Sequence, residues 1–268
     1  MDSRRLNYLR ALDIDVWQRR ELQATRAEQP PAAAVPVVAP PTVAAAPVRP
    51  PRPVAAAPKV ETVVPLRSMP RDDAVAAMGW DELFNAVRTC TKCPLHETRT
   101  QGVFGVGDRQ ARWMIIGEAP GADEDRQGEP FVGRAGQLLN SMLRAMGLAR
   151  EQVFIANILK SRPPGNRDPR PDEAAACLPY LFRQIELVNP TLLLCVGRIA
   201  AQTLLETDTP IGKLRGRLHT LPSGRPLIVT YHPAYLLRSP AEKRKSWADL
   251  VLAMQTFERL SDAAGQTT

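Results

Sequence analysis

Residues 113–121, WMIIGEAPG, set the fold class of this chain. The first five residues form a short apolar run, which is typical of a buried strand, and the Gly/Pro-containing segment that follows ends it. Three later segments share this pattern, and we predict strands at 153–157, 191–197 and 226–231.

Segments with helical spacing separate these strands. Residues 135–146 place their leucines and methionines on one face, and residues 172–188 begin with two acidic side chains, which a helix macrodipole favours. We predict further helices at 199–205 and 241–260. Strands that alternate with helices indicate an α/β protein, a three-layer α/β/α sandwich with a mostly parallel central sheet.

Composition divides the 268 residues into three zones. Residues 1–25 are charged and carry a few large apolar side chains, which suits a partner-docking peptide. Residues 26–72 are rich in Pro, Ala and Val, and proline removes backbone donors, so we predict an extended linker. Residues 73–268 should form the folded domain, so the protein is expected to carry a disordered N-terminal extension.

The charge balance and the cysteine content limit the function classes. The net charge is +7, but residues 73–268 hold 24 Lys/Arg against 21 Asp/Glu, so any affinity of this part for nucleic acid must come from local clusters. No run of 18 apolar residues is present, and the N-terminus lacks the apolar core of a signal peptide. We therefore expect a cytoplasmic protein without a membrane partner, whose four cysteines are thiols or metal ligands.

Polar motifs follow three of the predicted strands. The first strand leads into residues 118–121 (EAPG), the second into 160–167 (KSRPPGNR), and the fourth into 231–238 (YHPAYLLR). The carboxyl ends of parallel strands meet at one edge of a sheet, where ligands bind. The sequence therefore predicts one pocket at this edge.

These motifs resemble those of family-4 uracil-DNA glycosylases. The matching stretches are GEAPGADEDRQGEPFVGRAGQLL from Gly117, NILKSRPPGNRDP from Asn157 and HPAYLLR from His232, and the resemblance covers roughly residues 75–260. It implies the α/β/α fold, uracil-containing DNA as substrate and a structural 4Fe-4S cluster.

The resemblance assigns roles at the uracil pocket. Cleavage requires a base flipped out of the stack, and the departing uracil anion must be stabilised by preorganised donors. His232 would donate to uracil O2, the Asn157 amide would pair with O4 and N3–H, and Phe131 would stack on the base. Each of these has a structural alternative: a histidine capping a turn, an asparagine in a local turn, and a phenylalanine in the core.

Further residues complete the predicted site. Glu118, a third catalytic candidate, and Glu124 would orient water or exclude the thymine methyl, although Glu124 also fits a solvated acidic face. Gly117 and Ala119 would let backbone amides approach the base. The expected DNA contacts are phosphate-binding side chains and an apolar wedge: Lys160, Arg162, Arg167, Arg238, and Leu236 or Leu237.

The cluster ligands depart from the family pattern. Cys90, Cys93 and Cys177 match three of the four cysteines, whereas Ser161 occupies the remaining position. Serine is a harder and less acidic ligand, so iron affinity should fall. The cluster is either retained on three thiolates plus Ser161 or water, which we favour, or lost. Cys195 lies in a predicted strand and is expected to be a small core residue.

The N-terminal segment carries a second resemblance. Residues 3–20, SRRLNYLRALDIDVWQRR, resemble the psi subunit of DNA polymerase III in the region that binds the chi subunit. The resemblance implies that residues 1–25 bind chi, and the alternative is an unrelated amphipathic tail. A second hypothesis for the whole chain follows, a non-catalytic replisome adaptor built on a glycosylase fold.

Overall fold

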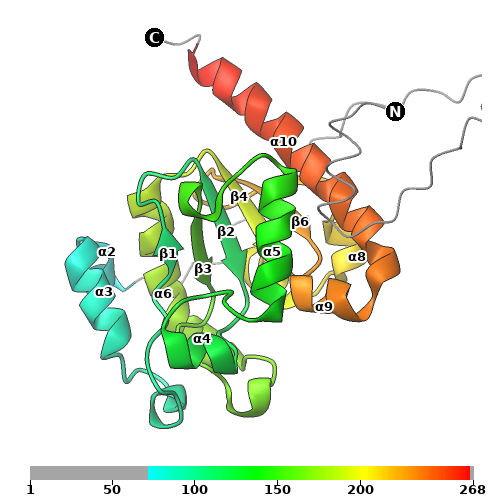
Figure 1. Cartoon of the computed structure of the whole chain (residues 1–268). Helices are drawn as coiled ribbons and strands as arrows, with labels where there is room; N and C mark the ends of the chain where they lie inside the picture. Colours follow the sequence, from blue (N-terminus) through cyan, green and yellow to red (C-terminus); the bar gives the residue numbers. More distant parts are fainter. Residues whose placement is uncertain (1–71, 266–268) are drawn as a thin grey trace, which may run out of the picture. The chain divides into compact units, whose positions relative to one another are not determined.

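The computed structural model describes residues 72–265 (Figure 1). The predicted docking peptide, 1–25, and all of the predicted linker except Asp72 lie outside the described residues, so both stay predictions. Asp72 belongs to the folded domain, because its side chain accepts a hydrogen bond from Val75 N and caps the first described helix.

A six-stranded sheet with the order β1-β3-β2-β4-β6-β5 forms the centre of the described domain. The strands are β1 Val106–Gly107, β2 Trp113–Gly117, β3 Phe154–Asn157, β4 Leu192–Val196, β5 Leu218–Thr220 and β6 Pro226–Thr230. The four inner strands are parallel, and β1 and β5 pair antiparallel at the two edges. All four predicted strands are confirmed to within one residue at each end, as is the mostly parallel sheet.

Helices cover both faces of the sheet. The α-helices are α2 Asp73–Ala76, α3 Trp80–Arg88, α4 Ala122–Gln127, α5 Arg134–Ala145, α6 Pro171–Val188, α7 Arg198–Leu204, α8 Ile211–Leu214, α9 Pro233–Arg238 and α10 Lys243–Gly265. Four short 3₁₀ turns accompany them: Pro94–Glu97, Arg150–Gln152, Pro164–Asn166 and Pro240–Glu242. The four predicted helices are confirmed, and no helix among residues 72–265 is long and apolar enough to cross a membrane.

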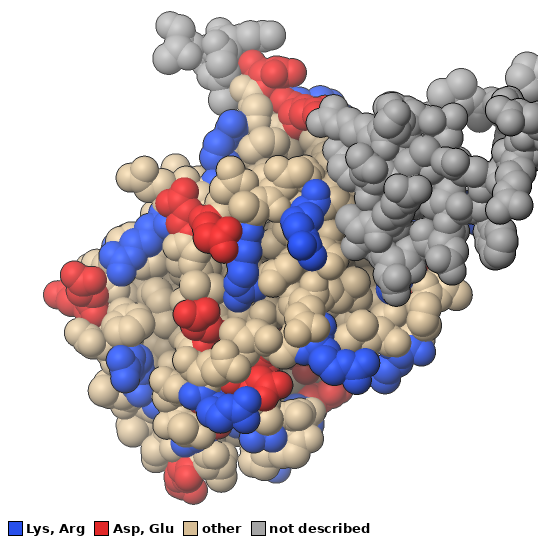
Figure 2. Space-filling view, in the orientation of Figure 1, with Lys and Arg blue, Asp and Glu red and all other residues tan. Residues whose placement is uncertain are grey.

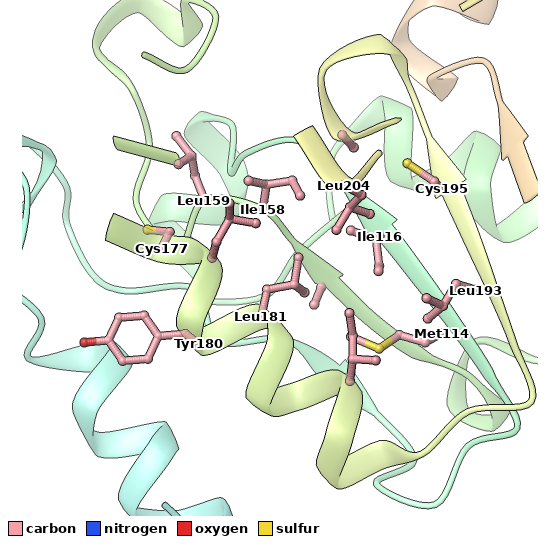
Figure 3. Packing of buried hydrophobic residues seen from close by; sticks show 14 of the residues in the cluster. Met114, Ile116, Ile158, Leu159, Cys177, Tyr180, Leu181, Leu193, Cys195 and Leu204 are labelled. Atoms are coloured by element: carbon pink, nitrogen blue, oxygen red, sulfur yellow. The ribbon is translucent and has the colours of Figure 1, made fainter. Parts of the chain in front are cut away.

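Alternation along the strands divides the core in two. Met114 and Ile116 of β2 pack in one core with the apolar residues of α3, α6 and α7, whereas Trp113 and Ile115 pack in the other with α5 and α10. Figure 1 shows α5 crossing one face of the sheet and α6 on the other. Figure 3 shows the first core, in which Cys195 is fully buried, so its prediction as a core residue is confirmed.

Candidate active site

A cavity of about 720 Å³ opens at the carboxyl ends of the inner strands. Eight of the predicted site residues line it. Six belong to the predicted catalytic and uracil-binding set, Glu118, Ala119, Glu124, Phe131, Asn157 and His232, and two to the predicted DNA contacts, Arg167 and Arg238. The first six come from the ends of β2, β3 and β6, from α4 and from the loop that leads into α5. The predicted convergence of three strand ends on one pocket is therefore confirmed.

Asn157 ends β3 and lies opposite Gly117 in the parallel pair with β2. Its side chain is buried, and its Oδ1 atom has no hydrogen-bond partner among the described residues. A Cβ atom at Gly117 would lie 2.4 Å from that Oδ1 and 2.5 Å from the Phe131 ring. Glycine is thus required here, and the unpaired buried acceptor beside the cavity is available to a ligand.

Phe131 stands beside the imidazole of His232, with ring centroids 5.6 Å apart. Its φ of 56° is unusual for a bulky residue, so the surrounding loop must hold it. The carboxylate of Glu124 does this: one oxygen accepts from Val132 N (2.9 Å) and Gly133 N (3.1 Å), and the other from Gly121 N (3.1 Å). Glu124 therefore ties the loop after β2 to the Phe131 loop, and the alternative of a solvated acidic face is wrong.

His232 is the N-cap of α9, and its Nδ1 atom accepts a hydrogen bond from Ala234 N at 3.1 Å. Burial, together with Arg238, lowers the pKa of His232 to about 4. The ring is consequently neutral at pH 7 and carries its proton on Nε2, which leaves an N–H donor beside the cavity. The structural alternative is correct in part, because the cap that stabilises the helix also selects this tautomer.

Glu118 follows β2 directly and is half-buried. Burial raises its pKa to about 7, and the charge of Asp168 adds to this effect while Arg198 opposes it. Asp168 and Arg198 form an ion pair of 2.8 Å and also line the cavity. Sequence reasoning missed both, although the strand-end rule points to Arg198 because it follows Gly197 at the end of β4.

Two predicted DNA contacts are wrong. The Lys160 side chain is 1% exposed, and its Nζ donates inward to Asn157 O (2.8 Å) and Gln184 Oε1 (2.7 Å), so it cannot reach a phosphate. Leu236 is also 1% exposed, because it packs into the core between α5 and α10. Its neighbour Leu237 is 36% exposed, so it is the leucine of this pair that lies at the surface.

The arginines predicted to contact DNA differ in whether they already make hydrogen bonds to side chains of the domain. Arg167 donates to both carboxylate oxygens of Glu173, and Arg162 donates to Asn166 Oδ1. Arg238 is exposed at the end of α9 on the cavity wall. Figure 2 shows basic and acidic side chains interspersed on the face that it presents, in line with the nearly balanced charge of the domain.

The cysteines other than Cys195 gather in one corner of the fold. A hydrogen bond between Cys93 and Cys177 lowers the pKa of Cys93 and raises that of Cys177, and Tyr180 Oη lies 3.4 Å from Cys90 Sγ. Ser161 belongs to the same corner through Arg99, which donates to Ser161 Oγ (2.7 Å) and to Cys90 O (2.8 Å).

The corner fits a cluster only in part. Three of the four cysteines that the resemblance implies are gathered here, but the hydroxyl of Ser161, at the fourth position, accepts a hydrogen bond from Arg99. Within residues 72–265, no three His, Cys, Asp or Glu side chains are arranged to hold a single metal ion.

Comparison with known proteins shows the family of this chain. The protein-family model described as "Uracil DNA glycosylase superfamily" matches residues 104–252. The type-4 uracil-DNA glycosylase of Archaeoglobus fulgidus is 41% identical over 193 residues, which cover 69% of this chain and 94% of that protein. The type-4 enzyme of Thermotoga maritima is 46% identical over 154 residues (57% and 80%), and the type-5 uracil-DNA glycosylase of Thermus thermophilus is 31% identical over 151 residues (48% and 68%). The chain therefore belongs to the uracil DNA glycosylase superfamily.

Proposed function

We propose that this protein is a uracil-DNA glycosylase, which hydrolyses the bond between uracil and deoxyribose in DNA. The observation that carries the proposal is the unpaired amide oxygen of Asn157 in the cavity that Phe131 and a neutral His232 share. A uracil flipped into this cavity would stack on Phe131 and donate its N3–H to Asn157 Oδ1. Its O4 atom would accept a hydrogen bond from Nδ2 of the same side chain.

The same amide would reject cytosine. Cytosine carries an acceptor at N3 and a donor at N4, so its pattern opposes that of uracil. A buried amide that meets the wrong pattern leaves polar groups unpaired, which costs about 1–3 kcal/mol for each group. Selection of uracil over cytosine thus follows from Asn157.

The chemical step separates the base as an anion. A water oxygen attacks C1′ of the sugar, the C1′–N1 bond breaks, and its electron pair passes to uracil, where the charge spreads over N1 and O2. The Nε2–H group of His232 donates to O2 and stabilises this charge. Glu118, whose pKa is about 7, orients the water and takes its proton. Leu237 and Arg238 on α9 contact the DNA around the vacated position.

The iron-sulfur proposal rests on the same family. Cys90, Cys93 and Cys177 would hold a 4Fe-4S cluster, with Ser161 at the fourth position. When bound, the cluster supplies a cross-link between three segments of the chain and takes no part in bond cleavage. Anaerobic purification followed by iron and sulfide analysis tests this, with Ser161→Cys expected to raise the iron content. Iron-free protein in both forms would contradict it.

The partner proposal concerns residues 1–25, which would bind the chi subunit of DNA polymerase III. It is supported by sequence resemblance alone. A pull-down with purified chi subunit tests it, and binding that is unchanged by Trp17→Ala would contradict it. The adaptor hypothesis for the whole chain gains no support from the cavity, which retains Glu118, Asn157 and His232 together.

The activity is tested with single- and double-stranded oligonucleotides that contain one uracil. Free uracil is measured directly, and abasic sites are cleaved with alkali. The wild-type protein should release uracil, and Asn157→Ala should abolish release. Asn85→Ala, on the exposed face of α3, is the matched control and should behave as wild type. A folded wild-type protein that releases no uracil would contradict the proposal.

A further inference from the structure

The side chain of Lys160 is buried immediately behind the wall that carries Asn157. Its Nζ atom donates to Asn157 O at 2.8 Å and to Gln184 Oε1 at 2.7 Å. Gln184 of α6 is itself fully buried, and its Nε2 atom donates to Phe104 O at 2.9 Å. A buried chain of hydrogen bonds therefore runs from Phe104 through Gln184 and Lys160 to the residue at the end of β3.

The backbone explains why Asn157 needs this donor. On the β2 side, Ile158 N donates to Gly117 O, so the sheet continues past Asn157. On the other side, β1 pairs only with Phe154 and Ile155, so it stops short of Asn157. A buried carbonyl without a partner is costly, and the Nζ amino group of Lys160 supplies the hydrogen bond that the edge strand does not.

The side chain of Asn157 has no comparable support. Its Oδ1 atom lacks a partner in the described domain, so hydrogen bonds to this oxygen do not orient the amide. Its direction depends on the peptide that bears it and on the close approach of Gly117. A displacement of that peptide by a fraction of an ångström would therefore move the amide relative to the base.

We propose that Lys160, supported by Gln184, is a positioning residue for uracil recognition: it holds the Asn157 carbonyl and thereby fixes the amide that reads the base. This inference rests on the proposed glycosylase function. It also replaces the predicted phosphate contact with a role inside the domain. The side chain acts through Asn157 and does not touch the substrate.

The test compares affinity for the base with affinity for the rest of the DNA. Lys160→Met removes both donated hydrogen bonds while keeping an unbranched apolar stem. We expect kcat for uracil release to fall about 10- to 100-fold and the inhibition constant of free uracil to rise by a similar factor, because the buried Asn157 carbonyl loses its hydrogen bond. The Kd for an oligonucleotide with a tetrahydrofuran abasic site should change less than about twofold, since that ligand has no base to read.

Two further variants keep the test decisive. Gln184→Met leaves the Lys160–Asn157 contact in place but removes its support, and it should produce a several-fold loss of uracil affinity if Lys160→Met does not fold. Arg112→Met is the control for replacing a long basic side chain by methionine, because Arg112 donates hydrogen bonds to Thr191 and Ser261 near the start of β2, at the opposite end of the strand from the cavity.

Three outcomes separate the possibilities. Unchanged uracil affinity in folded Lys160→Met, or in Gln184→Met if Lys160→Met does not fold, overturns the inference. Equal losses for uracil and for the abasic oligonucleotide also overturn it, because they indicate a general structural defect. A wild-type protein that releases no uracil refutes instead the proposed function on which the inference rests.

Discussion

His232 performs two tasks that substitution can separate. Its Nδ1 atom caps α9, and its ring lines the cavity, where the Nε2–H group is the proposed donor to uracil O2. Asparagine is among the best N-cap residues, but its side chain is too short to replace the Nε2–H donor. His232→Asn should therefore keep the helix cap and lose the catalytic donor, whereas His232→Ala should lose both.

The magnitudes follow from these contacts. Removal of one preorganised donor to a developing oxyanion costs about 2.7–4 kcal/mol, or roughly 10²–10³ in kcat. Loss of a helix N-cap costs about 1 kcal/mol of stability. We expect both variants to lose two to three orders of magnitude in kcat, and His232→Ala alone to be less stable, by about 1 kcal/mol.

Single-turnover uracil release and urea denaturation measure the two effects. Because burial lowers the pKa of His232 to about 4, the wild-type rate should show no loss from His232 protonation until the pH falls towards that value. The unfolded histidine binds its proton at a higher pH, so this group's contribution to stability is present above about pH 6.5 and is lost as the pH falls to about 4. A folded His232→Asn protein with a rate within threefold of wild type would refute the reasoning.

Three other changes test the neighbouring residues. Since the pKa of Glu118 is about 7, the rate of uracil release should rise between pH 6 and pH 8 as the carboxylate ionises. Glu118→Gln should release uracil more slowly and with a flat pH–rate profile, and a pH-dependent rate in this variant would contradict the role of Glu118 as the base. Gly117→Ala should reduce the rate of uracil release more than about 100-fold, because the added Cβ would lie 2.4 Å from Asn157 Oδ1. Near-normal uracil release would contradict this, because it would show that the site accommodates the added methyl group. In urea denaturation, Leu236→Ala should lower the free energy of unfolding by about 2–5 kcal/mol, because Leu236 is buried. Leu237→Ala should change it by less than about 0.5 kcal/mol but weaken binding to uracil-containing duplex DNA. The opposite pattern would reverse the assignment of the two leucines.

Periodicity predicted the centre of the fold well for a physical reason. The inner strands are buried on both faces, so each appears as a continuous apolar run with a clear end. The edge strands β1 and β5 contain two and three residues and are not fully buried, which leaves no comparable signal. The short helices α2, α4 and α8 have the same problem, because four to six residues give too little helical periodicity.

Side-chain orientation accounts for the errors at the site. Lys160 and Leu236 belong to the matching motifs, but a motif does not reveal which neighbours point inward. Lysine is almost never fully buried, so the sequence favoured a surface contact. The burial of Lys160 follows from the carbonyl of Asn157, which the edge strand leaves unpaired. This becomes apparent only when the pairing of β1 with β3 is known to end at Ile155. The carboxylate of Glu124 is similarly engaged by three backbone amides whose convergence no spacing predicts.

Diffraction from crystals soaked with free uracil tests the central claim most directly. We predict that uracil lies against Phe131, with Asn157 Oδ1 within hydrogen-bond distance of N3 and His232 Nε2 within hydrogen-bond distance of O2. Uracil bound elsewhere, or bound in this cavity with its N3 and O4 edge turned away from Asn157, would contradict the account.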